Sequence, residues 1–259
     1  MELTILGGSA AGPNPGQGCS GYLVESGTTR VVVDLGSGTF PELRRHVDYR
    51  LIDAVVLSHG HLDHFLDILA LRYALAYNPI AAGRPLPLWL PPGGLELLDR
   101  LAQAVTNDLD PEEFLSVFEA NQYDPDALLR IGELLLRFHP TVHFVPCWAM
   151  RISNGVDGDL FYTADTGPAA NFATAASGSQ VIVAEGTERE DTQEPFESRG
   201  HMTPTEAAAL ARDAGANLLV LSHLWVEHDP FRAVSEASRV FGGEVALATP
   251  GLHIGWHAN

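Results

Sequence analysis

One short stretch constrains this chain more than any other. Residues 57–64 read LSHGHLDH and bring His59, His61, Asp63 and His64 close together. A buried imidazole needs partners for both ring nitrogens, so such a crowd is poor material for a core. In an extended or loop segment, residues i and i+2 point the same way, and His59 and His61 can therefore reach one metal ion. Asp63 and His64 follow where the chain turns into a helix, so their side chains diverge toward a second ion.

The ligand spacing differs from that of a helical zinc site, in which two histidines lie four residues apart. It suits a strand–loop–helix junction, and neutral imidazoles with a carboxylate match Zn²⁺ or a similar divalent ion. We expect the remaining ligands at the ends of other strands, where three residues qualify: His143, Asp165 and His223. His201 is a further polar group, just before a helix, that is expected to point at the same site.

Short β-rich runs alternate with helical stretches along the chain. Apolar residues at helical spacing predict one helix over 65–77. Thr203, Pro204 and Glu206 predict another, with an N-cap, a proline in the first helical position and a capping box. The other expected elements are strands at 3–6, 21–25, 29–36, 53–58, 218–222 and 244–251 and a helix at 94–105.

Residues 107–127 form an acidic, irregular segment. Runs of like charge usually lie in water, which predicts a solvated loop or cap. Phe114 and Phe118 lie four positions apart and would allow a short helix to dock.

Charge limits the partners of this chain. Its 259 residues carry a net charge of −18 and include no lysine. Proteins that grip nucleic acid need a basic surface to displace counterions from the phosphates. Long nucleic acid is therefore not an expected partner, whereas a small phosphate ester could enter a local cationic site.

Composition also sets the expected compartment and domain count. The chain is 46% hydrophobic, enough for one large α/β domain over residues 1–259. No apolar run approaches the roughly 20 residues that span a bilayer, and no signal peptide is recognisable. Cys19 and Cys147 make no disulfide framework, so we expect a cytoplasmic protein.

The residues of this cluster resemble the metallo-β-lactamase superfamily. Residues 59–64 match its HxHxDH signature, and the later elements follow in the family's order over nearly the whole chain. The resemblance implies an α/β fold, an αββα four-layer sandwich with the metal site at the edge of its two sheets. It implies two divalent metal ions, Zn²⁺ with Mn²⁺ or Fe²⁺ as alternatives. One would be held by His59, His61 and His143, the other by Asp63, His64 and His223, with Asp165 bridging.

Two later motifs are similar to the ribonuclease Z and phosphodiesterase branch of that superfamily. They are YTADTG at 162–167 and the stretch 201–224. By resemblance, His201 stabilises or protonates the departing oxygen, and Glu185 orients a histidine. Asp63 would hold the nucleophile besides binding metal, and a homodimer is implied. His139 competes with His143 as third ligand, and the family's spacing favours His143.

Two departures from ribonuclease Z point to smaller substrates. The segment between His143 and Asp165 leaves no room for that enzyme's tRNA-gripping arm, and the N-terminal loop lacks its basic residues. The pattern looks like that of bacterial cyclic-nucleotide phosphodiesterases, so we expect a small phosphodiester as substrate.

Three alternatives stay open. A carboxyl-type hydrolase would act on a lactone, thioester or β-lactam with the same metals. A tRNA 3′ endonuclease would need a basic exosite, and a non-catalytic metal-binding protein would be expected to lack a ligand or His201. The sequence leaves the roles of Trp225 and His228 open.

Overall fold

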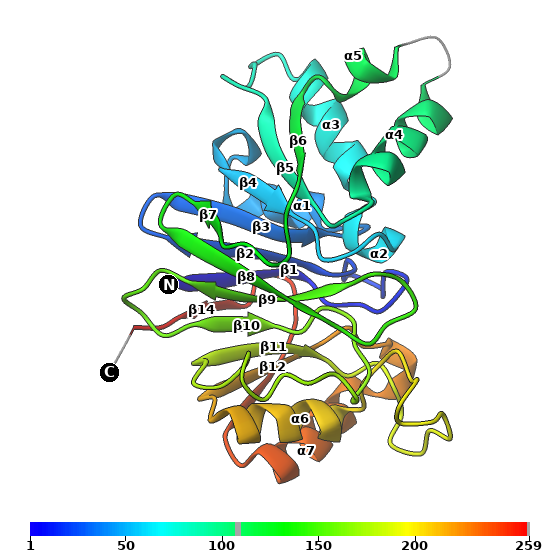
Figure 1. Ribbon diagram of the computed structural model, residues 1–259, viewed down its shortest axis with the longest axis vertical. Coiled ribbons are helices and arrows are strands. Elements are labelled where there is room, and N and C mark those ends of the chain that lie inside the picture. Colours follow the sequence, from blue (N-terminus) through cyan, green and yellow to red (C-terminus); the bar gives the residue numbers. More distant parts are fainter. Residues whose placement is uncertain (107–109, 258–259) are drawn as a thin grey trace.

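The computed structural model describes residues 1–106 and 110–257 of the chain. Two seven-stranded sheets pack face to face, and helices cover the outer face of each (Figure 1). The predicted αββα sandwich is therefore confirmed. Within the described residues, no helix has both the length and the apolar character that crossing a membrane requires.

The first sheet has the strand order β14-β1-β2-β3-β4-β5-β6. Strands β1, β2 and β3 pair antiparallel, whereas β3 to β6 pair parallel. Parallel strands end at one edge, which gathers their following loops there. The bounds are β1 (Glu2–Gly7), β2 (Gly21–Ser26), β3 (Thr29–Leu35), β4 (Ala54–Val56), β5 (Leu86–Leu90), β6 (Phe118–Gln122) and β14 (His253–Gly255).

The second sheet has the order β13-β12-β11-β10-β9-β8-β7. Strands β10 to β13 pair parallel, and β7 to β10 pair antiparallel. The bounds are β7 (Leu129–Ile131), β8 (Leu134–Pro140), β9 (Trp148–Ser153), β10 (Leu160–Tyr162), β11 (Val181–Glu185), β12 (Leu218–Ser222) and β13 (Glu244–Leu247).

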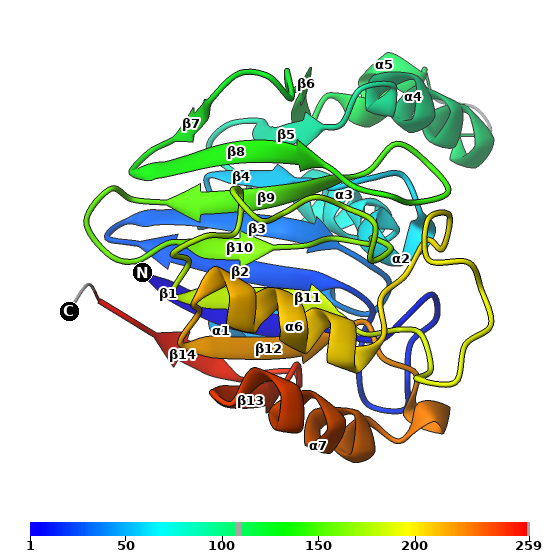
Figure 2. The same ribbon diagram turned by 60° about the horizontal axis from the view of Figure 1, so that its bottom comes forward.

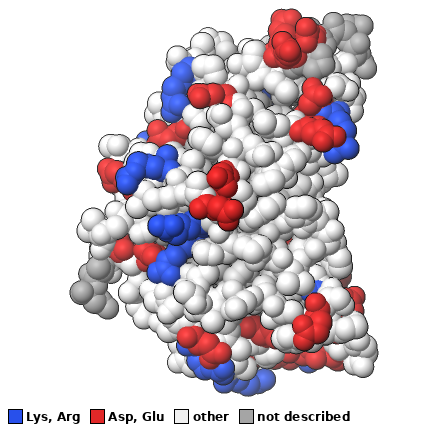
Figure 3. Space-filling view, in the orientation of Figure 1, with Lys and Arg blue, Asp and Glu red and all other residues white. Residues whose placement is uncertain are grey.

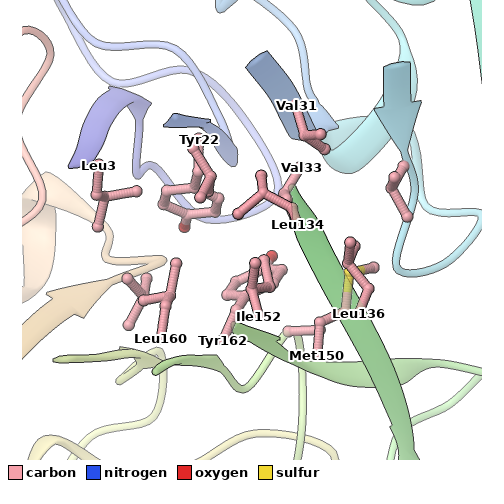
Figure 4. Close-up of a cluster of buried hydrophobic side chains, with 14 of the residues drawn as sticks. Leu3, Tyr22, Val31, Val33, Leu134, Leu136, Met150, Ile152, Leu160 and Tyr162 are labelled. Atoms are coloured by element: carbon pink, nitrogen blue, oxygen red, sulfur yellow. The ribbon is translucent and has the colours of Figure 1, made fainter. Parts of the chain in front are cut away.

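The main core lies between the two sheets. Figure 4 shows Leu3, Tyr22 and Val33 of the first sheet facing Ile152 and Tyr162 of the second. Along β3, Val31 and Val33 enter this core, while Val32 packs under the helices on the other side. Both faces of the strand are thus buried, which explains its continuous run of valines.

Helices form the two outer layers (Figure 2). On the first sheet lie α1 (Phe40–His46), α2 (Leu62–Phe65), α3 (Ile68–Tyr77), α4 (Gly94–Val105) and α5 (Pro111–Leu115), with the 3₁₀ turn η1 (Tyr49–Leu51). On the second lie α6 (Pro204–Ala214) and α7 (Pro230–Phe241), with η2 (Val226–His228). The predicted start of α6 is confirmed: Thr203 caps it, Pro204 opens it and Glu206 completes the capping box.

The helix predicted over 65–77 is wrong in its first turn. The chain forms α2 and α3 instead, separated at Leu66 and Asp67. The Asp67 backbone N–H donates to the Leu35 carbonyl, and its carboxylate accepts from the Phe40 N–H. These contacts to β3 and α1 interrupt a single helix and fix α2 at the sheet edge.

The acidic segment is more ordered than a solvated loop. Strand β6 lies inside it and forms the edge of the first sheet. Phe114 on α5 is only 1% exposed, so the predicted docking of a short helix is confirmed for this residue. Phe118 is also buried, but it begins β6 and is not part of that helix. Residues 107–109 of this segment lie outside the described part. The last expected strand, 244–251, is also shorter and ends at Leu247.

Candidate metal centre

Most of the candidate ligands lie in the segments that follow parallel strands. His59 and His61 follow β4, and Asp63 and His64 occupy the first residues of α2. His223 follows β12 directly, and Asp165 lies three residues after the end of β10. Figure 1 shows α2 at one end of the sandwich and both chain termini at the other. The loops between β8 and β9 and before α6 supply His143 and His201.

The first group consists of His59, His61, His143 and Asp165. One ligand atom from each lies within 4.8 Å of all the others. Nε2 of His143 is 3.1 Å from Nδ1 of His61, and Nε2 of His59 is 3.7 Å from Oδ2 of Asp165. The structure brings together the residues that the sequence predicts for the first metal. His139 lies outside this group, on β8.

The second group consists of Asp63, His64, Asp165 and His223, again within 4.8 Å of one another. Nε2 of His64 is 3.2 Å from Oδ1 of Asp165, and Nε2 of His223 is 3.1 Å from Oδ2 of Asp63. Asp165 belongs to both groups, with Oδ2 toward the first and Oδ1 toward His64. Oδ2 also lies 3.5 Å from Nε2 of His223, so the Asp165 carboxylate is within reach of both groups.

Hydrogen bonds fix which nitrogen of two ligands faces the centre. Nδ1 of His143 donates to the Gly200 carbonyl at 2.9 Å. Nδ1 of His223 donates to Oγ1 of Thr187 at 2.6 Å, because that hydroxyl already donates to the His223 carbonyl. The neutral form of each ring therefore has its lone pair on Nε2, the atom that points at the other ligands.

Asp34 is a functional residue that sequence reasoning missed. It ends the apolar run of β3, is fully buried, and accepts from the N–H and Oγ of Ser58 and from Tyr162. Nδ1 of His64 also donates to it, at 2.8 Å. Nδ1 of His59 donates to Oγ of Ser58, so Asp34 orients both histidines. A carboxylate closing a buried strand was the available signal.

Burial sets the charge of the first group. It lowers the pKa of His61 and His143 and places the pKa of His59 well below its ordinary value. These imidazoles are neutral at neutral pH, which is the form that binds a metal.

Carboxylates set the charge of the second group. Burial opposes ionisation of Asp165, but His223 and His64 outweigh it and hold the Asp165 pKa well below its usual range. Burial likewise opposes charge on His64, yet Asp165 and Asp34 raise its pKa well above normal. The buried carboxylates thus favour positive charge at this place, and a bound divalent cation would supply it in place of the His64 proton.

The donor set fits divalent metal ions. Nε2 of His59 is buried and has no hydrogen-bond partner among the described residues, although its ring is held in place through Nδ1. An oriented, unpartnered imidazole nitrogen beside a shared carboxylate is costly unless a cation occupies the space. Imidazole nitrogens and carboxylate oxygens match Zn²⁺, Mn²⁺ or Fe²⁺.

Backbone strain gathers at the same place. Asp34, Ala164 and His223 have positive φ angles of 55°, 50° and 55°, in a region that residues other than glycine seldom adopt. Ala11 also has a positive φ, and its N–H donates to Oδ2 of Asp63 at 2.9 Å. Such strain persists where surrounding contacts enforce it and is common at functional sites.

His201 lies next to the two groups that share Asp165 but belongs to neither of them. Its Nδ1 donates to Glu185, 2.9 Å from Oε1, and its ring stacks on that of His223. Burial lowers its pKa, but the Glu185 carboxylate outweighs this and raises the pKa to about 9. With Glu185 and His223 it also forms a third possible metal group. Nδ1 is already used, so Nε2 is the nitrogen left for a substrate.

Several nearby residues have structural roles. Phe65 is buried, Trp148 packs at the edge of the core, and Cys147 is a buried thiol whose pKa burial raises well above normal. His228 is exposed. Sequence reasoning missed Phe144, which is 66% exposed although its ring lies beside those of His143 and His201.

Known proteins share this fold and sequence. Residues 29–224 match the family described as the beta-lactamase superfamily domain. The chain is 32% identical over 256 residues to the probable metallo-hydrolase YhfI of Bacillus subtilis (strain 168), covering 97% of this chain and 98% of YhfI. The crystal structure of YhfI superposes with a TM-score of 0.85, at 30% identity and 98% coverage of both chains.

More distant proteins also resemble this chain in sequence or in fold. Ribonuclease Z of Methanopyrus kandleri is 28% identical over 288 residues, covering 98% of this chain and 97% of that enzyme. A diphosphatase from the PhnP family shares the fold, with a TM-score of 0.76, 18% identity and coverage of 99% and 98%. The resemblance found in the sequence is confirmed: the chain belongs to the beta-lactamase superfamily and is a metallo-hydrolase with the metallo-β-lactamase fold.

Proposed function

We propose that this protein is a dinuclear metal-dependent phosphodiesterase that acts on small phosphodiesters, with cyclic nucleotides as the first candidates. The observation that carries the proposal is the shared carboxylate of Asp165 between two groups of imidazoles, with His201 beside them. His59, His61 and His143 would hold one ion, and Asp63, His64 and His223 the other. When bound, such a pair of divalent ions supplies charge for the phosphoryl oxygens and lowers the pKa of the attacking water.

Asp63 is suited to orient the nucleophile. Its Oδ2 accepts from the Ala11 N–H and lies 3.1 Å from Nε2 of His223, so the carboxylate is held in one orientation. Neighbouring histidines keep the pKa of Asp63 below its usual range, against the effect of burial. An ionised, oriented carboxylate can accept a hydrogen bond from the attacking water and align it with phosphorus.

His201 is suited to assist the leaving oxygen. Glu185 fixes its ring through Nδ1 and favours the protonated imidazole. The Thr166 N–H donates to Oε1 of the same carboxylate, which ties Glu185 to the loop that carries Asp165. An imidazolium presenting Nε2–H can stabilise or protonate the alkoxide that departs from phosphorus.

Surface charge favours a small substrate. On the face seen in Figure 3, arginine side chains form separate spots next to acidic ones and make no continuous basic stripe. A net charge of −18 repels a polyanion over the Debye length of about 8 Å. A small ester carries few charges, so two bound dications outweigh that distant repulsion.

The related proteins support phosphate chemistry. One relative is named ribonuclease Z and one fold neighbour a diphosphatase. A carboxyl-type hydrolase remains the alternative function, since the same ligands can serve a carbonyl. A single domain over residues 1–259, a homodimer and a cytoplasmic location remain predictions.

We expect a substrate panel to separate these functions. The metal-analysed protein should cleave cyclic nucleotides or bis-p-nitrophenyl phosphate and act weakly on tRNA precursor. Lactones, thioesters and β-lactams should be poor substrates. The phosphodiesterase proposal would be ruled out if the protein cleaved any of these carbonyl compounds at least a hundredfold more efficiently than every phosphodiester. That ratio corresponds to about 2.7 kcal/mol of transition-state preference.

A further inference from the structure

An apolar cleft opens next to the first group of ligands. It has a volume of about 400 Å³, and His59 and Gly60 form part of its wall. Val145 and Pro146 form another part, only two and three residues after His143. The cleft is thus continuous with the loops that carry three of the candidate ligands.

The inner wall of the cleft is aliphatic and deeply buried. Leu57, Leu88, Leu98 and Phe65 are each at most 3% exposed. Backbone N–H groups of the loop at its end are already used: Gly93 donates to Oε1 of Gln122, and Gly94 to a carbonyl. A polar group pushed into this wall would lose its bonds to water, which costs about 1–3 kcal/mol.

Leu97 on α4 narrows the cleft at the metal loop. A Cβ placed on Gly60 would come within 2.7 Å of Cδ2 of Leu97, so this side chain touches the backbone between His59 and His61. The side chains of Glu96 and Arg100 also line the cleft and are exposed. One acceptor and one donor therefore stand at the solvent side of an otherwise apolar cavity.

We infer that this cleft binds an aromatic ring carried by the ester group of the substrate. The inference rests on the proposed function, since the metal centre would hold the phosphoryl group while the ring enters the cleft. Ring faces fit aliphatic walls, and the few polar atoms of a ring edge can meet Glu96 and Arg100. Either an aryl group or a nucleobase has this chemistry, and the volume accommodates both.

Binding of phosphonates and phosphate monoesters, anions that lack the phosphodiester bond to be cleaved, tests the inference without requiring turnover. Calorimetry of the metal-loaded protein would compare phenylphosphonate with methylphosphonate, and adenosine 5′-monophosphate with ribose 5-phosphate. In at least one pair, the anion with the ring should bind about tenfold or more tightly than the anion without it, because the ring is buried in the cleft. We call this ratio of affinities the ring advantage. A gain in the first pair only indicates an aryl substrate, and a gain in the second a nucleotide.

Leu97→Trp is the blocking variant, because a larger side chain at this position fills the cleft. It should reduce the ring advantage to less than about twofold. Methylphosphonate binding, measured alongside, shows whether the larger side chain has also disturbed the metal loop that Leu97 touches. Leu95→Trp is the matched control on the same helix, where Leu95 is 42% exposed and does not line the cleft. If Leu97→Trp fails to fold, Leu97→Ala should lower the ring's advantage severalfold by removing wall contacts.

Equal affinity within both pairs in the wild-type protein would overturn the inference. So would a ring advantage that survives Leu97→Trp with binding intact. Hydrolysis of lactones instead of phosphodiesters, with the ring advantage preserved, would defeat the proposed function alone. Phosphodiester hydrolysis without any ring advantage would defeat the cleft alone.

Discussion

His201→Ala is expected to retain the metal content of the wild-type protein and to lose about 10²–10⁴-fold in turnover, the usual range for acid–base assistance. Nδ1 of His201 is bound to Glu185, and the side chain is not required by either group that shares Asp165. On the proposed mechanism, its removal should take away proton transfer to the leaving oxygen and leave the ligands in place. Metal analysis and steady-state kinetics on the best phosphodiester measure both quantities.

A control and a second leaving group sharpen this test. His228→Ala removes an exposed histidine of the neighbouring loop and should change turnover little. The His201→Ala loss should shrink for p-nitrophenolate, a good leaving group that needs little protonation. Loss of metal in His201→Ala would instead identify His201 as a ligand, through the third possible group with Glu185 and His223.

Asp34→Ala is expected to be the most destabilising of these variants. The carboxylate accepts from Ser58, His64 and Tyr162, and all of these donors are buried. Without the carboxylate these buried donors have no acceptor. The free energy of unfolding should therefore fall by about 3–5 kcal/mol, the usual cost of removing one partner of a buried charged pair. Urea unfolding of the metal-free protein measures this change.

Metal affinity should fall as well, because Asp34 orients His64 directly and His59 through Ser58. Loss of such supporting contacts typically weakens metal binding 10–100-fold. Asp53→Ala is a suitable control, since that partly exposed carboxylate accepts mainly from the Arg30 N–H at a distant strand end. An Asp34→Ala protein as stable as Asp53→Ala, with unchanged affinity, would contradict the role given to Asp34.

Local signals in the sequence predicted much of the fold. The capping box at Thr203 and the valine run of β3 depend on neighbours in the chain, and both were found as expected. The break between α2 and α3 was not predictable in this way. It arises from hydrogen bonds that Asp67 makes to Leu35 and Phe40, which are distant in sequence. Strand β6 was missed because its five residues lie within a longer acidic segment, and its pairing with β5 depends on residues distant in the sequence.

In the candidate site, too, some residues carry a local sequence signal and others depend on tertiary contacts. The candidate ligands could be proposed because two-residue spacing and strand ends carry a local signal, and their division between two metals followed from the resemblance to the metallo-β-lactamase superfamily. The support given by Asp34, the exposed ring of Phe144 and the cleft behind Gly60 depend on tertiary contacts. Asp34 looked like an ordinary strand end, and only the packing of β3 against α2 shows that it holds His64.

The number of metal ions bound per chain is the most direct test of the proposed dinuclear site. Metal analysis of the wild-type protein, titrated with Zn²⁺ or Mn²⁺, should give about two tightly bound ions. Asp165→Ala should lower that number, because Asp165 is the ligand that both groups share. A matched Asp159→Ala variant, which removes the Arg151 partner on the same sheet, should keep both ions. One ion or fewer in the wild-type protein, with no change in Asp165→Ala, would contradict the dinuclear site.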